Sequence, residues 1–207
     1  CVCFVGFVLW NGGVAVGDRE SHSAASHLAQ PFYFTLFATA TLSPLLFHPK
    51  LFSSFFSWLR NNPLSCLLFL LVACFSIMFG TIAHPYLIAD NRHYTFYFWK
   101  NFMARFAWFR YALIPPYLLS LFTLCSSLSH LLSPLRITLL LLSSSLVLIP
   151  AGLVEFRYFT IPTLLILHHI PLPSPSCKSL SLVWIQQVAC LACFVIVNAL
   201  TIGVYVW

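Results

Sequence analysis

One polar run, Asp90–Lys100, interrupts an otherwise apolar chain and sets a carboxylate, a carboxamide, a guanidinium and an imidazole side by side, followed by aromatic residues. A guanidinium offers a planar pair of donors to phosphate oxygens, and Asp and Asn side chains can bond to sugar hydroxyls. We therefore predict a phosphate and sugar site, although the aromatic residues alone are also typical of a membrane-interface belt. The candidate residues are Asp90, Asn91, Arg92, His93, Tyr94 and Lys100.

Two further stretches pair acids with arginine, namely Asp18-Arg19-Glu20 and Glu155-Phe156-Arg157. Together with Asp90 they hold all 4 carboxylates of the chain. Such a pair could be a self-neutralising turn of little energetic value, or it could line a cavity at the membrane boundary. We add Asp18, Arg19, Glu155 and Arg157 to the candidates.

The elements that position these residues are predicted to be transmembrane helices. The 207 residues are 60% hydrophobic and only 7% charged, whereas soluble domains carry about 25% charged residues. Because a bilayer core offers no water as a partner, backbone N–H and C=O groups there must form hydrogen bonds with one another, which favours helices. We predict an all-α, polytopic bundle in a single domain, residues 1–207. The net charge of +6 is scattered between apolar runs, so it indicates membrane-flanking positions and not a nucleic-acid partner.

Seven apolar runs are candidate spans, each judged against the roughly 20 residues that cross a bilayer. The sixth is short and contains Pro162, so it could be a tilted span or a re-entrant segment. The runs are 1–17, 28–47, 64–83, 111–132, 137–154, 158–170 and 180–207.

If every run crosses, the connections alternate between two sides of the membrane. Linkers 18–27, 85–110 and 153–158 then share one side, which holds all the acids. Linkers 48–63, 133–136 and 171–179 share the other and carry only basic residues, typical of cytosolic anchors. We therefore predict that the stretches combining acids with arginines face the lumen.

Other chemistries lack support in the sequence. The histidines and the 8 cysteines show no spacing typical of a zinc site, and no nucleophile elbow, Walker loop or dinucleotide fingerprint occurs. We predict no metal and no cofactor. Two classes remain open: an enzyme acting on a lipid-linked substrate, or a non-catalytic polytopic membrane subunit, transporter or channel regulator.

The stretches around the acids also resemble a known family. Four stretches match motifs of that family and follow one another in the same order as in the family, namely Asn11–His22, Leu87–Lys100, Leu153–Pro162 and Ile170–Pro173. The chain resembles the C-terminal half of the dolichyl-phosphate-glucose-dependent alpha-1,2-glucosyltransferases of asparagine-linked glycosylation, the DIE2 family of GT-C class.

The resemblance implies a multi-pass endoplasmic reticulum enzyme. It would transfer the third glucose, with inversion, from dolichyl-phosphate glucose to Glc2Man9GlcNAc2-PP-dolichol, so its partners are these two lipids and the membrane. Because the chain begins at Cys1 within an apolar run, we expect upstream sequence to carry the general base in the first lumenal loop. Arg92, His93 and Arg157 would then bind donor phosphate, Asp90 and Glu155 would orient them or the glucose, and this chain alone would be inactive.

Overall fold

The structure is a computed structural model that describes residues 2–13, 25–48, 50–89 and 94–171, together with short pieces at 184–185, 188–189, 191–196 and 199, and only the backbone at Tyr94. Its described residues contain helices and no strand, which confirms the all-helical class. The elements are α1 Val2–Asn11, α2 Gln30–Thr41, α3 Ser43–Leu46, α4 Leu51–Asn61, α5 Pro63–Gly80, α6 Pro85–Ala89, α7 Tyr94–Phe98, the π-helical turn η1 Trp99–Met103, α8 Ala107–Ala112, α9 Ile114–Leu128, α10 Pro134–Leu148 and α11 Phe156–His168.

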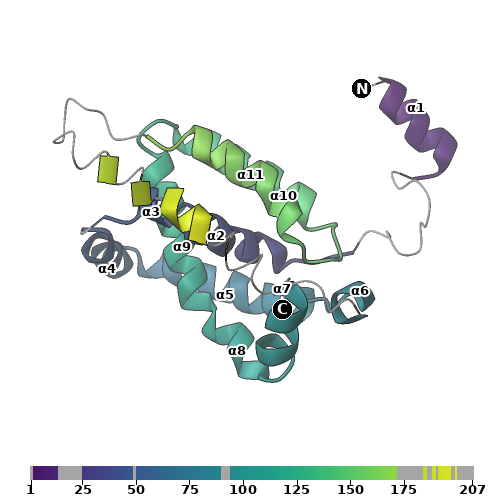
Figure 1. Cartoon of the computed structure of the whole chain (residues 1–207), viewed down its shortest axis with the longest axis horizontal. Coiled ribbons are helices and arrows are strands. Elements are labelled where there is room, and N and C mark those ends of the chain that lie inside the picture. Colours follow the sequence, from purple (N-terminus) through teal and green to yellow (C-terminus); the bar gives the residue numbers. More distant parts are fainter. Residues whose placement is uncertain are drawn as a thin grey trace.

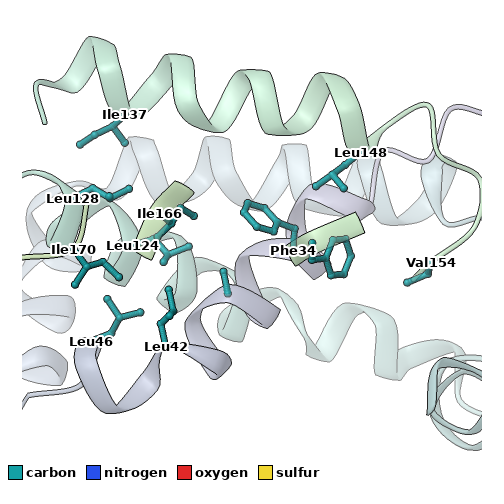
Figure 2. Packing of buried hydrophobic residues seen from close by; sticks show 12 residues of the cluster. Phe34, Leu42, Leu46, Leu124, Leu128, Ile137, Leu148, Val154, Ile166 and Ile170 are labelled. Atoms are coloured by element: carbon teal, nitrogen blue, oxygen red, sulfur yellow. The ribbon is translucent and has the colours of Figure 1, made fainter. Parts of the chain in front are cut away.

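Helix α2 lies at the centre of the bundle (Figure 1). It packs most extensively on α9 and also contacts α10 and α11. Phe34 and Ala38 of α2 meet Leu124 of α9, Leu148 of α10 and Phe159 of α11 in one buried cluster (Figure 2). Helix α1 has no buried residue and lies apart from the other helices in Figure 1.

Prolines explain several helix boundaries. Pro31, Pro63 and Pro134 stand in the first turns of α2, α5 and α10, where an amide proton has no helical partner to lose. Pro44 stands at the start of α3, so the predicted span 28–47 is divided into two helices between Thr41 and Ser43.

Within the described residues, two helical stretches are long and apolar enough to cross a bilayer: α5 and the segment Ala107–Leu128, which combines α8 and α9. Apolar side chains of α5 point outward, with Leu64, Leu68 and Phe79 exposed by 77%, 62% and 64%. A water-soluble protein rarely leaves so large an apolar surface uncovered, so these helices indicate a membrane protein. Helices α1 and α10 are apolar but shorter, and the predicted count of seven spans stays a prediction.

The polar segment 85–110 is more helical than the linker that the sequence suggested. Helices α6, α7 and α8 and the turn η1 occupy nearly all of its described residues. In η1 the amide of Ala104 donates to the carbonyl of Trp99 at 2.8 Å, five residues back. Single π-helical turns of this kind are frequent at functional sites.

The ends of the helices gather on two opposite sides of the bundle. Leu46, Leu128 and Ile170 come together at one end, whereas Leu148 and Val154 lie near the start of α2 at the other (Figure 2). Leu87 and Thr95 line one cavity with Val154, and Ala25 lies against Gly152, so the described parts of the acid-bearing linkers share this end, as the alternation of spans predicted. Which end faces the lumen stays a prediction.

Candidate functional site

A cavity of about 240 Å³ lies at the end of the bundle where segment 94–110 meets the start of α11. Thr95 and Trp99 of the Asp90–Lys100 run line one part of its wall, and Val154 and Phe156, on either side of Glu155, line another. Side chains of α2, including Tyr33, complete the enclosure. The structure thus brings together two of the three stretches that the sequence singled out.

The cavity wall is almost entirely apolar. Apart from Thr95, the hydroxyls of Tyr33 and Tyr117 and the indole N–H of Trp99, its lining side chains are apolar, with one thioether at Met103. Such a surface suits a hydrocarbon chain, since buried sugar hydroxyls would lack hydrogen-bond partners. A ligand seated here would place an apolar part inside and a polar group among the charged residues outside.

Glu155 and Arg157 form an ion pair beside this cavity. The arginine side chain is 71% exposed and the glutamate side chain 20%, so the pair is open to a ligand and contributes little to stability. Arg157 also lies over the ring of Tyr158, with 5.4 Å between guanidinium carbon and ring centroid. Glu155 directly precedes α11 in extended backbone, and Arg157 is in the first turn of that helix.

The basic residues of segment 94–110 stack on aromatic rings. Lys100 is exposed and its Nζ lies 5.5 Å from the centre of the Phe96 ring. Arg110 lies over Trp99 at 5.4 Å and donates from Nε to the carbonyl of Met103 at 2.8 Å. Arg110 thereby fixes η1 and the indole that lines the cavity, a role that no sequence motif indicated.

Three connections pack tightly behind this site. A Cβ atom on Gly152 would lie 3.3 Å from side-chain carbons of both Ala25 and His84. The amide of Ala29 donates to the carbonyl of Gly80 at 3.2 Å. The connections before α2, after α5 and after α10 therefore form one compact junction.

Several predicted site residues lie outside the described residues: Asp18, Arg19, Asp90, Asn91, Arg92 and His93, together with the side chain of Tyr94. Leu87 and Thr95, which precede and follow residues 90–93 in the sequence, both line the cavity. Within the described part of the chain, no three His, Cys, Asp or Glu side chains are grouped as metal ligands.

Comparison with known proteins gives one consistent group of relatives. The chain is 36% identical to a human protein over 203 residues, 98% of this chain and 41% of the relative. A Drosophila melanogaster protein is 42% identical over 78% of the chain and 35% of its own length. An Arabidopsis thaliana protein is 41% identical over 81% and 34%. All three are named Dol-P-Glc:Glc(2)Man(9)GlcNAc(2)-PP-Dol alpha-1,2-glucosyltransferase.

The chain thus spans about two fifths of the length of the human relative. No solved structure matches it significantly. The sequence model of the DIE2/ALG10 family matches residues 1–168, a range that includes all of the predicted site residues. The chain belongs to the DIE2/ALG10 family.

Proposed function

We propose that this chain is the donor-holding part of an alpha-1,2-glucosyltransferase. The enzyme transfers glucose from dolichyl-phosphate glucose to Glc2Man9GlcNAc2-PP-dolichol, as the names of the relatives describe. It is an endoplasmic reticulum protein with seven spans, and the acid-bearing end of the bundle faces the lumen. The observation that carries the proposal is the apolar cavity with an exposed ion pair beside it.

The reaction is an inverting displacement. An acceptor hydroxyl attacks the anomeric carbon of the donor glucose, the bond from that carbon to the phosphate oxygen breaks, and dolichyl phosphate leaves. A general base takes the proton of the acceptor hydroxyl. We assign no residue of this chain as that base. Among the described residues the only carboxylate is Glu155, and it is paired with Arg157.

The contribution of this chain is electrostatic and positional. Arg157, with Arg92 and His93, binds the phosphate of the donor, whose negative charge grows as the glucosyl bond breaks. Glu155 and Asp90 orient these cations or the glucose, and Asn91, Tyr94, Lys100, Asp18 and Arg19 are further candidates near the donor. The cavity takes the first part of the dolichyl chain, because its wall is apolar.

Alanine at Arg157 or Arg92 in the full-length enzyme tests this proposal. Each change should lower kcat/KM for dolichyl-phosphate glucose by about 10- to 100-fold, the value of a hydrogen bond to a charged group. Arg105→Ala is the matched control, since Arg105 is exposed and stacks on Phe106 in the same segment but does not line the cavity. Lipid-linked oligosaccharides that end after two glucoses should accumulate in the first two variants alone. Normal terminal glucosylation in both would refute the site.

A further inference from the structure

Five successive carbonyl groups, those of residues 149–153, all accept hydrogen bonds from residues 25–30. Backbone amides supply two of them: His27 donates to Ile149 at 2.9 Å and Ala25 to Pro150 at 3.0 Å. Side chains supply the other three. Segment 149–155 lies between α10 and α11 and has no helical bonds of its own to satisfy these acceptors.

Gln30 is the central side chain of this arrangement. Its Nε2 donates to the carbonyls of both Ala151 and Leu153, using the two N–H groups that a carboxamide provides. The side chain is fully buried, so the loss of either bond would leave a carbonyl without a partner or with only water. Leucine or methionine would fill the same volume but could not donate.

His27 completes the set from one turn earlier. Its Nδ1 lies 3.2 Å from the carbonyl of Gly152, and since a carbonyl can only accept, Nδ1 is the protonated nitrogen. Like Gln30, His27 is fully buried. The carbonyls of residues 151, 152 and 153 are thereby held in turn by Gln30, His27 and Gln30.

The segment fixed in this way leads directly to the candidate site. Val154, which follows the last bonded carbonyl, lines the cavity, and Glu155 and Arg157 come next in the chain. We propose that Gln30 is a positioning residue for the Glu155–Arg157 pair: its two hydrogen bonds set where the pair stands relative to the donor. This inference rests on the proposed function of that pair.

The test is Gln30→Met in the full-length enzyme, with Thr35→Val as matched control. Thr35 is a buried polar residue on the same helix, and its hydroxyl donates to the carbonyl of Phe32, its one partner among the described residues. We expect Gln30→Met to raise KM for dolichyl-phosphate glucose about tenfold or more, since small displacements of a binding group carry costs of this order. The KM of the oligosaccharide acceptor and both constants of Thr35→Val should stay unchanged.

A purely structural role gives a different result. It would reduce the amount of folded enzyme, whereas the molecules that remain would keep the wild-type donor KM, and that outcome overturns the inference. If Gln30→Met does not fold, Gln30→Asn retains the amide on a shorter side chain and should raise the donor KM by a smaller factor. A donor KM unchanged in the folded Asn variant would overturn the inference equally.

A double-mutant cycle separates this inference from the proposed function. If Gln30 acts through Arg157, Gln30→Met should add little to the defect of Arg157→Ala, because groups that act together are not additive. Additive defects overturn the inference. An impaired Arg157→Ala beside a normal Gln30→Met refutes only the role of Gln30. A normal Arg157→Ala removes Arg157 from the proposed site, whatever Gln30→Met does, and a normal Arg92→Ala beside it refutes that site altogether.

Discussion

The backbone of Gly80 lies directly against the backbone of Leu28. A Cβ atom on Gly80 would stand 2.7 Å from the amide nitrogen of Leu28 and 2.9 Å from its Cα. This contact joins the end of α5 to the start of α2, and the neighbouring amide of Ala29 bonds to the carbonyl of Gly80. The junction behind the candidate site therefore has no room for a side chain at position 80.

Gly80→Ala should destabilise the fold by about 1–3 kcal/mol, the usual cost of forcing an extra group into a packed site. The atoms in the way are the backbone nitrogen, Cα and Cβ of Leu28, and none of them can rotate aside because the Cβ atom is fixed to the backbone. Thermal unfolding in detergent, followed by circular dichroism, would measure the loss. Gly6→Ala is the control, since a Cβ atom at Gly6 meets nothing within 4 Å. Equal melting temperatures for the two variants would contradict the close approach.

The sequence predicted the helical class and the shared end of the acid-bearing linkers for a simple physical reason. The length of an apolar run indicates a helix that faces lipid. The number of such runs before a connection indicates on which side of the membrane that connection lies. It did not predict that α6, α7 and η1 would be helical within segment 85–110. The polar and aromatic residues in this segment hide the apolar pattern that would predict helices. The helices are stabilised by the packing of Leu87, Trp99 and Met103 on one another.

The candidate site was predictable only in part. Charge pairing drew attention to Glu155 and Arg157, which the structure places together. Gln30 and Arg110 were not predicted, because no sequence motif marks either residue. Gln30 donates to the carbonyl of Leu153, which is distant in sequence, and Arg110 donates to the carbonyl of Met103. A single polar residue at the start of an apolar run, such as Gln30, is the signal that could have indicated a buried hydrogen-bonding role.

Acidification should weaken the junction through His27. Burial lowers its pKa to about 4, and its hydrogen bond to Gly152 offsets part of that fall. In the unfolded chain the pKa returns to about 6.5, so between these values the unfolded state binds more protons and stability falls as pH falls. The free energy of unfolding falls by at most about 1.4 kcal/mol per pH unit, and this decrease ends near pH 4.

His27→Asn isolates this effect, because asparagine can still donate to Gly152 but does not titrate. Melting temperatures from pH 7 to pH 4.5 should fall more steeply for the wild-type protein than for the variant. The comparison of two curves removes the titration of carboxylates common to both. Parallel curves would show that folding does not lower the pKa of His27, which would contradict this prediction.

The two ends of the bundle should be accessible from opposite sides of the membrane. A flexible tag with acceptor sites for N-glycosylation, inserted between Ala104 and Arg105, should be glycosylated because our proposal places that end in the lumen. The same tag between Ser129 and His130, after α9, should not be. Glycosidase-sensitive shifts on a gel measure both. Glycosylation of the second tag alone would reverse the orientation.

The cavity beside Glu155 shares two lining residues of α2 with a second cavity. Leu36 and Ala40 line both this cavity and a second apolar one of about 570 Å³, which extends to Phe52 and Phe56 of α4. A dolichyl chain that enters at the charged end could therefore run along both. Ala40→Trp places an indole where they adjoin, and should weaken binding of long-chain dolichyl-phosphate glucose more than binding of a short-chain prenyl analogue.

The ratio of donor KM values for the long and short lipids measures this effect and is independent of how much enzyme folds. About 0.8 kcal/mol is lost for each methylene displaced from an apolar site, so even a few displaced groups should change the ratio about tenfold or more. Leu146→Trp is the control, because Leu146 is 65% exposed on α10 and lines neither cavity. If Ala40→Trp leaves the ratio at the wild-type value, the lipid does not pass Ala40, and the second cavity plays no part in holding the donor.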